Sequence, residues 1–224
     1  MASGRRPESI RVFRSPFLEA CTHAHPVVPL ALGGPLVAWL LYRALAVHHL
    51  GIPAVAAVGG LGLLAWTLTE YGLHRFLFHL EPEGPRRARL QFMLHGLHHA
   101  DPLDPTRLVM PPVAAVIGGV ALYGLSRLLL GRTWVDPFYA SFLLGYLTYD
   151  YIHFGVHRFS PRTRIGQSLK RNHMRHHYLT PDARWGVSSP LWDYVFGTIE
   201  KLEPAQEARG ADTEPPRRPP GETR

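Results

Sequence analysis

The chain has 224 residues, a formal net charge of +7 at neutral pH, 46% hydrophobic residues and 14 histidines. Its length suits one domain rather than two, and a single cysteine, Cys21, excludes an intramolecular disulfide, a C-x-x-C redox pair and a cysteine-rich zinc site. The basic residues are not interleaved with aromatic residues and no nucleic-acid motif occurs, so we expect no nucleic-acid partner.

Four apolar stretches follow a polar, basic segment that covers residues 1–26. Each stretch approaches or reaches the roughly 20 residues needed to cross a bilayer. Short turns at 48–51 and 131–133 join the stretches in pairs. The pattern predicts an all-α integral membrane protein with four transmembrane helices in two hairpins, over residues 27–47, 52–73, 112–130 and 135–152. Glycines suited to close helix packing in lipid recur in these stretches: Gly33, Gly34, Gly59, Gly60, Gly118 and Gly119.

Positive charge is distributed unevenly around the four stretches. Of the 24 Lys and Arg residues, 21 lie in the N-terminal segment, in residues 74–110 or after the fourth stretch, and only Arg43, Arg127 and Arg132 lie toward the other side. The positive-inside rule places the positively charged face in the cytoplasm. The N-terminal segment has no apolar signal-peptide core, and arginine far outnumbers lysine, as in GC-rich bacterial genomes. We therefore expect a multi-pass protein of the bacterial inner membrane.

Ten of the 14 histidines form four groups, all on the expected cytoplasmic side. Neutral imidazole is the commonest protein ligand for borderline transition metals, and ten imidazoles exceed what one ion can hold. The sequence therefore predicts a dinuclear metal site, held by a cytoplasmic helical cap and by the ends of the second and fourth transmembrane helices. The groups are His74 with His79; His95, His98 and His99; His153 with His157; and His173, His176 and His177.

Helical spacing indicates how these side chains converge. On an α-helix, residues i, i+3 and i+4 share one face, so we expect each H-x-x-H-H triplet, and the His153/His157 pair, to point to one side. His74 and His79 are five residues apart and out of register, which predicts that the helix ends, bends or bulges between them. The remaining histidines lie outside the pattern, the last two at the opposite membrane face: His23, His25, His48 and His49.

Four polar side chains near these groups are candidates for orienting or lining the site. Asp150 precedes the third histidine group by one turn and Glu70 precedes the first, so their carboxylates can accept the free imidazole N–H groups. Tyr149 and Tyr178 can line the site. Helix packing or ordinary hydrogen bonding explains each of the four residues equally well.

The histidine pattern resembles that of the integral-membrane di-iron superfamily, which holds fatty acid hydroxylases, sterol desaturases and carotenoid hydroxylases. The neighbouring residues are similar to those of the fatty acid 2-hydroxylases. The likeness covers residues 60–200. We expect a membrane-embedded hydroxylase domain at 27–202. The tail at 203–224 is rich in proline and charged residues, so we expect it to be disordered. The residues that carry the likeness are Glu70 to Phe76, Met93 to His99, Arg107 to Pro112, Gly145 and Tyr146, Tyr149 and Asp150, and Leu191 to Tyr194.

The resemblance implies an oxygenase that hydroxylates a long-chain acyl lipid of the bilayer at C2. Two iron ions would use O2 and two external electrons, whereas zinc, which has no redox chemistry, would occupy the site only as a substitute in purified protein. Many eukaryotic members carry a fused haem domain. Only about 25 polar residues precede the first apolar stretch, and the His-Pro-Gly-Gly signature of that domain does not occur. We therefore expect a separate electron-transfer protein, ferredoxin- or cytochrome-like.

Three other functions are weighed against this one. A sterol or carotenoid hydroxylase or desaturase has the same metal core, and only residues 107–112 favour a fatty acyl substrate. A zinc-dependent membrane lipid hydrolase would use about three ligands per ion and a carboxylate, as in H-E-x-x-H, a motif that does not occur here. A metal transporter or sensor would place its ligands at mid-membrane, whereas these histidines gather at one end.

Overall fold

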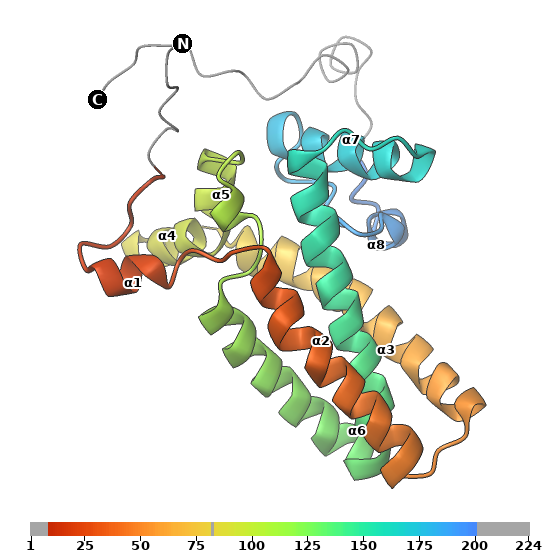
Figure 1. Cartoon of the computed structure of the whole chain (residues 1–224). Helices are drawn as coiled ribbons and strands as arrows, with labels where there is room; N and C mark the ends of the chain where they lie inside the picture. Colours follow the sequence, from red (N-terminus) through yellow and green to blue (C-terminus); the bar gives the residue numbers. More distant parts are fainter. Residues whose placement is uncertain (1–8, 82, 201–224) are drawn as a thin grey trace, which may run out of the picture.

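The structure, a computed structural model, describes residues 9–81 and 83–200, and its regular elements over these residues are all helices (Figure 1). Three of these elements are long and apolar enough to cross a membrane: Val27–Val47, Ile52–Phe78 and Pro105–Arg158. The predicted all-α class and membrane location are thereby confirmed. The third element contains both the third and the fourth apolar stretch. The tail predicted at 203–224 lies outside the described residues.

Helix α2 is continued by the π-helix η1, and α3 is continued by the π-helix η2. Helix α6 follows a 3-10 turn, and the remaining helices are short apart from α7. The long elements are α2 (Val27–Tyr42), η1 (Arg43–Val47), α3 (Ile52–Gly72), η2 (Leu73–Phe78) and α6 (Pro112–Arg158). The others are α1 (Pro16–Ala20), α4 (Pro85–Gln91), η3 (Phe92–Gly96, a π-helix), α5 (Leu97–Ala100), η4 (Pro105–Arg107), α7 (Arg164–Tyr178) and α8 (Leu191–Val195).

Helix α6 is interrupted at Gly131, where φ is 74° and ψ is −174°. Glycine adopts this positive φ without the steric cost that a Cβ would bring. The chain reverses direction there, as two contacts across the turn show. The Tyr139 hydroxyl donates a 2.6 Å hydrogen bond to the Gly119 carbonyl, and the Tyr139 ring packs edge-on against Tyr123 at 5.1 Å. Helix α6 therefore has a first arm, 112–130, and a second arm, 132–158, which lie side by side (Figure 1).

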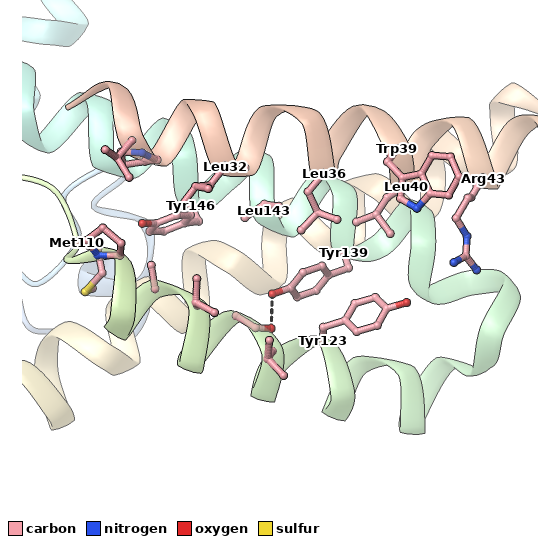
Figure 2. Close-up of a pocket in the computed structure, with 18 residues that line it drawn as sticks. Leu32, Leu36, Trp39, Leu40, Arg43, Met110, Tyr123, Tyr139, Leu143 and Tyr146 are labelled. Carbon is pink, nitrogen blue, oxygen red and sulfur yellow. Dashed lines mark hydrogen bonds between the residues drawn. The ribbon is translucent and has the colours of Figure 1, made fainter. Parts of the chain in front are cut away.

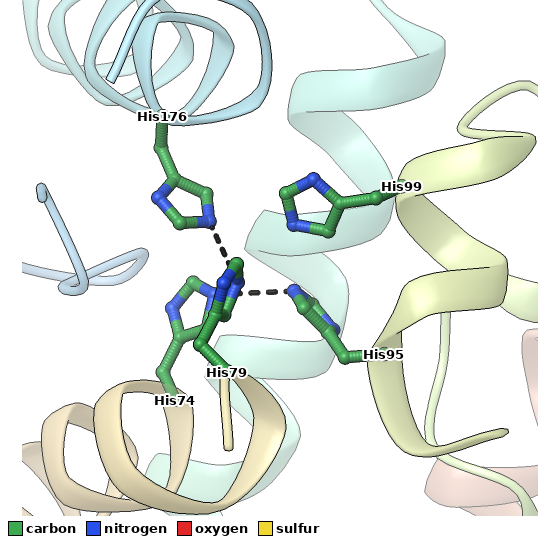
Figure 3. A group of neighbouring side chains, drawn as sticks. All are labelled: His74, His79, His95, His99 and His176. Carbon is green, nitrogen blue, oxygen red and sulfur yellow. Dashed lines mark hydrogen bonds between the residues drawn. The ribbon is translucent and has the colours of Figure 1, made fainter. Parts of the chain in front are cut away.

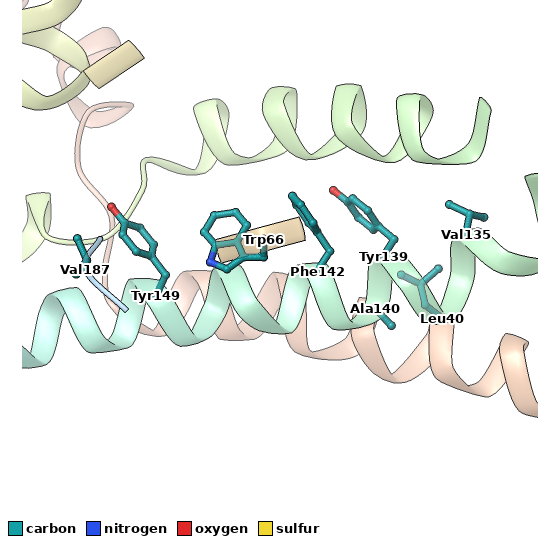
Figure 4. Packing of buried hydrophobic residues seen from close by; sticks show 8 residues of the cluster. All are labelled: Leu40, Trp66, Val135, Tyr139, Ala140, Phe142, Tyr149 and Val187. Carbon is teal, nitrogen blue, oxygen red and sulfur yellow. The ribbon is translucent and has the colours of Figure 1, made fainter. Parts of the chain in front are cut away.

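The buried core lies mainly between α3 and the second arm of α6 (Figure 4). The Trp66 ring packs against Phe142, Tyr146 and Tyr149, with ring centroids 5.3, 5.4 and 5.8 Å away. Such tilted and edge-on aromatic pairs add favourable energy beyond the area that they bury. This aromatic row extends from mid-helix to Tyr149, so it holds α3 and the second arm in register up to the histidine-bearing end.

Two glycines allow α3 and the second arm to approach closely. A Cβ at Gly145 would lie 2.7 Å from the Trp66 ring, and a Cβ at Gly62 would lie 2.1 Å from the Phe138 carbonyl oxygen. Neither glycine was singled out from the sequence. Of those that were, a Cβ would lie 3.4 Å or less from a side chain of another helix at Gly33 and Gly59, and from a side chain of the second arm at Gly119. A Cβ would meet nothing within 4 Å at Gly60 and Gly118.

The short helices α4, α5, α7 and α8 gather around the same ends of α3 and of the second arm (Figure 1). The α2–α3 turn and the Gly131 reversal lie at the other end. There the fully buried Asp136 carboxylate accepts contacts from Arg43 at 2.9 Å and His48 at 3.0 Å. This cluster links the turn between α2 and α3 to the start of the second arm.

The N-terminal segment packs against the loop before α6. The Arg107 guanidinium, whose side chain is 4% exposed, donates to the Ile10 carbonyl at 2.7 Å and to the Glu19 carboxylate at 2.9 Å. Ser9 donates to Asp104 in the same loop at 2.5 Å. Since the neighbouring Leu108 carbonyl contacts His153, the segment supports the histidine-bearing end from outside.

Candidate metal centre

His74 lies on the π-helix η2, and His79 is the residue that follows and caps it. A π turn closes an i→i+5 hydrogen bond, which places residues five apart above one another. The His79 N–H donates this bond to the His74 carbonyl at 3.2 Å, and the two imidazole centroids are 5.2 Å apart. The helical distortion that the five-residue spacing predicts is thus present, and it turns both side chains to one side.

The H-x-x-H-H triplets lie on two different kinds of helix. The second triplet lies on α7, as the spacing predicts. In the first triplet, His95 belongs to the π-helix η3 while His98 and His99 lie on α5, which has only four residues. The expectation of one regular α-helix under the first triplet is therefore wrong, because a π turn inserted before α5 changes the register between His95 and the other two.

The ten imidazoles form two clusters, and in each cluster five ring nitrogens lie within 4.8 Å of one another. Each triplet is divided between the clusters rather than converging on one point. The first cluster contains His74, His79, His95, His99 and His176 (Figure 3). The second cluster contains His98, His153, His157, His173 and His177.

The spacing of the Nε2 atoms fits a metal ion in each cluster. In the first cluster the Nε2 atoms of His74 and His95 are 3.1 Å apart, and those of His79 and His176 are 3.2 Å apart. In the second cluster four such pairs are 2.8 to 3.1 Å apart. Imidazole nitrogens bind metals at about 2.1 Å, so two ligands at right angles would be about 3.0 Å apart and two tetrahedral ligands about 3.4 Å. Five of these six distances lie nearer the right-angle value, and the 3.2 Å between His79 and His176 lies between the two.

Burial keeps these imidazoles neutral. Desolvation lowers the pKa of His79 to about 4 and that of His99 to about 3, from an ordinary value of 6.5. Burial and, after it, the neighbouring imidazoles hold the pKa of the other cap histidines well below that value: His95, His98, His173, His176 and His177. A neutral imidazole has one nitrogen lone pair free for a cation. At neutral pH the clusters are therefore in the protonation state that metal binding requires.

Backbone carbonyls orient three of the imidazoles. The Nδ1 atoms of His74, His153 and His176 lie 2.6, 2.8 and 2.8 Å from the carbonyl oxygens of Trp185, Leu108 and Ala183, respectively. A carbonyl oxygen only accepts, so each Nδ1 carries the proton and donates it. Each Nε2 then presents its lone pair to the cluster. The buried Nε2 of His99 has no hydrogen-bond partner in the described chain. An ion in the first cluster would accept its lone pair.

Two buried carboxylates hold the loop that supplies two of these carbonyls. Glu70 accepts the backbone N–H groups of Val187 and Ser188 at 2.8 Å each, together with the Ser188 hydroxyl. Asp193 accepts the backbone N–H groups of Trp185 and Gly186, also at 2.8 Å each. Glu70 thus acts on the loop behind His74 rather than on an imidazole. Asp193 was missed as a site residue, although its full burial beside the histidines makes it part of the support.

The other sequence candidates also lie next to the clusters. The Tyr149 ring is stacked on His153 at 5.8 Å with an interplanar angle of 6°, and Tyr178 lies 5.8 Å from His177. Asp150 is buried, and its carboxylate accepts the Met110 N–H at 3.3 Å, while the His153 Nδ1 contacts the Leu108 carbonyl. Asp150 and His153 thus both hold the segment between Leu108 and Met110.

A small cavity of about 40 Å³ opens beside both clusters. Its wall includes His95 of the first cluster with His98 and His153 of the second. Tyr149 and Asp150 line the same cavity. A small molecule or a single carbon atom in this space would therefore face both metal positions.

Comparison with known proteins agrees with this geometry. Residues 59–198 match the fatty acid hydroxylase family. A dihydroceramide fatty acyl 2-hydroxylase of Arabidopsis thaliana is 36% identical over 202 residues, which cover 88% of this chain and 83% of the plant protein. The fatty acid 2-hydroxylase of Homo sapiens is 34% identical over 218 residues, which cover 87% of this chain and 58% of the human protein.

A yeast relative and a solved structure agree with this assignment. A ceramide very long chain fatty acid hydroxylase of Saccharomyces cerevisiae is 41% identical over 173 residues, which cover 72% of this chain and 44% of the yeast protein. A solved structure, described as full-length scs7p with only the hydroxylase domain visible, matches with a TM-score of 0.77 at 37% identity, over 83% of this chain and 70% of that one. The chain therefore belongs to the fatty acid hydroxylase family of oxidoreductases.

Proposed function

We propose that the chain is a membrane-bound di-iron oxygenase that hydroxylates a long-chain fatty acyl group at C2. The observation that carries the proposal is the pair of five-imidazole clusters that share both triplets and border one small cavity. An unactivated C–H bond needs an oxidant stronger than any side chain, which a metal supplies. The names of the plant and human 2-hydroxylases support C2 as the position.

Iron suits the two clusters better than zinc. Two six-coordinate ions offer about twelve positions, so ten imidazoles leave about two for O2 or water. The Nε2 spacings, such as the 3.0 Å between His98 and His153, agree with right-angle ligands rather than with the tetrahedral set that zinc prefers. Zinc can still replace iron in purified protein.

The reaction consumes one O2, two electrons and two protons for each hydroxyl group formed. When bound, iron supplies the activation of O2: one oxygen atom enters the C–H bond and the other leaves as water. The residues of the chain hold the ions, exclude water and place the acyl carbon. We assign Tyr149 the task of fixing the His153 ring by stacking, and Asp150 the task of holding the Met110 segment at the cavity wall.

We propose that residues 27–202 form the hydroxylase domain and that the two arms of α6 are separate spans, which gives four spans in two hairpins. The Gly131 reversal and the apolar character of both arms support this topology. The positive-inside rule supports a cytoplasmic position for α4, α5, α7, α8 and the basic segment at 1–26. The relatives described above are eukaryotic, so they give no support to a bacterial inner membrane.

A separate ferredoxin- or cytochrome-like protein would deliver the electrons. Between Asp150 and Asp182 the chain has no acidic residue. The end of α6 and the start of α7, which carry ligands of the second cluster, also expose a row of basic side chains. This charge favours a partner with an acidic face. The exposed residues of the row are Arg158, Arg162, Arg164 and Arg171.

Lipid mass spectrometry of cells that express the chain tests the proposal. We expect acyl lipids with one added oxygen at C2 in cells with the intact chain, none with His98→Ala, and an unchanged amount with the control His25→Ala. His25 is an exposed histidine outside both clusters. Oxygenated sterols or carotenoids without 2-hydroxy acyl lipids would refute the acyl assignment and favour a sterol or carotenoid substrate. The absence of any oxygenated lipid, in protein that holds two irons, would refute it as well.

A further inference from the structure

A second and much larger cavity lies along the membrane-spanning part of the molecule and is partly open at its side, where Val116 and Val120 are more than half exposed. It has a volume of about 390 Å³ and lies between α2 and the first arm of α6, with side chains of the second arm as its floor (Figure 2). Its walls are mostly aliphatic and aromatic; Leu36 of α2 and Val116 and Val120 of the first arm are among them. Such a cavity fits an apolar, flexible ligand.

One end of this cavity lies next to the small cavity beside the histidine clusters. Met110 lines both cavities, and its backbone N–H is held by Asp150 at 3.3 Å. Tyr146, one turn before Asp150, also lines the large cavity at this end (Figure 2). A chain that enters the large cavity therefore has its leading atoms next to the histidines His98 and His153 once it passes Met110.

The other end lies beside a buried ion pair. Trp39 and Arg43 line the cavity there, and Arg43 is paired with the buried Asp136 at 2.9 Å (Figure 2). His48 contacts the same carboxylate at 3.0 Å. A hydrocarbon chain gains nothing by displacing a paired buried charge, because an unpaired carboxylate in this position would be strongly unfavourable. The cavity therefore has a defined terminus.

The distance between these ends exceeds the thickness of the hydrocarbon of one leaflet. Both Val28 and Arg43 of α2 line the cavity. Fifteen residues of α-helix, each rising 1.5 Å, correspond to about 22 Å. The hydrocarbon core of a bilayer is about 30 Å thick, so one leaflet accounts for about 15 Å. The cavity thus suits an acyl chain longer than one leaflet is thick.

The walls of the cavity are fixed in place. The Tyr139 hydroxyl donates to the Gly119 carbonyl, which ties the two arms of α6 together under the cavity (Figure 2). The Tyr123 ring packs edge-on against Tyr139 at 5.1 Å. A preformed cavity binds its ligand without first ordering its own walls, which distinguishes it from a surface wetted by exchanging lipid.

We propose that this cavity binds the acyl tail of the substrate and sets the chain length that is hydroxylated. The C2 end lies past Met110 at the metal clusters, and the terminal methyl group lies toward Trp39 and Arg43. The proposal rests on the acyl hydroxylase function proposed above. It adds the position of the substrate and names the side chains that limit the length of the acyl chain.

Tryptophan substitutions along the cavity test whether its length limits the length of the acyl chain. The variants are Val116→Trp near the Met110 end and Val120→Trp farther along, with Ile117→Trp as control. Val120 and Ile117 are 68% and 66% exposed on the same arm, but only Val120 lines the cavity, so the pair separates blocking from mere bulk. Leu36→Trp blocks the cavity from the opposite helix, should a first-arm variant misfold.

Full-length protein in cells is supplied with saturated acyl chains of graded length, and the 2-hydroxy products are compared. We expect Val120→Trp to lower the ratio of the longest to the shorter products by about tenfold or more, because excluding even two methylenes has that effect. Val116→Trp lowers all products, Trp39→Ala extends the accepted length, and Ile117→Trp matches the unmodified chain. Equal product profiles for Val120→Trp and Ile117→Trp would overturn the proposal.

A binding measurement separates this proposal from the function on which it rests. A fatty acid probe with a photoreactive diazirine near its terminal methyl group is added to membranes that hold the protein, and labelled peptides are mapped. We expect labelling around Trp39 and Tyr123, competed by unlabelled fatty acid. If that labelling occurs but no 2-hydroxy lipid forms, the acyl-binding site is supported and the proposed hydroxylase function is refuted. Equal labelling of the lipid-facing Leu128 would mean that bulk lipid fills the cavity, and the proposal would fail.

Discussion

The carboxylate of Glu70 accepts a 2.8 Å hydrogen bond from the backbone N–H of Val187, 117 residues farther along the chain. Both residues are buried, and the bond ties α3 to the loop whose carbonyls contact His74 and His176. Two imidazoles of the first cluster are therefore oriented through a carboxylate that contacts neither of them directly.

Replacing Glu70 by Gln should lower metal occupancy without unfolding the protein. Glutamine can keep one oxygen on the N–H groups of Val187 and Ser188, but its NH2 group cannot accept from the Ser188 hydroxyl, and loss of the charge weakens the remaining bonds. The loop is then held less firmly behind the Nδ1 atoms of His74 and His176. We expect activity to fall by about 10- to 100-fold, as is typical for groups that orient metal ligands. Metal analysis and circular dichroism of purified protein would measure occupancy and helix content. The control is Glu83→Gln, which alters an exposed pair with Arg87; equal metal loss in both variants would contradict the role of Glu70.

The division of the triplets predicts that neighbouring histidines control different ions. His95 belongs to the first cluster and His98 to the second, although they are three residues apart. His95→Ala and His98→Ala should each leave about one metal ion per chain, and the double variant should leave none. Metal analysis gives the stoichiometry, and Mössbauer spectra of iron-57-loaded protein show which of two environments is lost. Loss of the same environment in both single variants would show that the triplet acts on one ion.

The first span and the turn at Gly131 follow from the sequence, whereas the division of the histidines does not. Apolar length and the Gly131 turn are local properties, so the first span, 27–47, and the reversal in α6 were predicted. Spacing along one helix says only that three imidazoles share a face. Which ion each of them reaches depends on the π turn before α5 and on where α7 lies, and both are set by contacts distant in sequence.

The backbone carbonyls that accept from the imidazoles could not be predicted from the sequence either. The carbonyls of Trp185 and Ala183 could belong to any residue type, so no side chain marks them as His partners. The carboxylates that fix their loop do leave a signal, since acidic residues are rarely buried without such a task. Glu70 was found for its position near His74, but its actual partners became visible only in the fold.

Acidification should destabilise the metal-free protein. Burial lowers the pKa of His79 to about 4 and that of His99 to about 3, while both would titrate near 6.5 in the unfolded chain. Between the folded and unfolded pKa values the unfolded state binds more protons than the folded state. The stability therefore falls as the pH decreases from about 6.5 to about 3, and these two groups leave it constant above that window. Thermal unfolding of metal-depleted protein in detergent, followed at several pH values, measures this. An unfolding temperature that rises on acidification would contradict the prediction.

Substitution of Arg107 should loosen the N-terminal segment. Lysine keeps the charge but has no planar fork to reach the Ile10 carbonyl and Glu19 together. We expect Arg107→Lys to lower the unfolding temperature and to speed proteolysis before α2, because a largely buried pair is broken. Limited proteolysis in detergent measures the second effect. The matched control, Arg87→Lys, changes an exposed arginine and should leave both readouts unchanged.

The contact between α3 and the second arm predicts opposite tolerance at two nearby glycines. A Cβ at Gly62 would lie 2.1 Å from the Phe138 carbonyl oxygen, and backbone there cannot move without separating the two helices. A Cβ at Gly60 would meet nothing within 4 Å. We expect Gly62→Ala to destabilise the fold by about 1 to 3 kcal/mol, as overpacked interiors do. Gly60→Ala should be neutral or slightly stabilising, because alanine favours helix.

The same pair links packing to the metal centre. Since α3 continues into η2, a displacement at Gly62 is carried toward His74 and the first cluster. Gly62→Ala should therefore lower both the unfolding temperature in detergent and the iron content, whereas Gly60→Ala should change neither by much. A Gly62→Ala protein with full iron content and an unchanged unfolding temperature would show that α3 can shift relative to the second arm, against the close contact seen here.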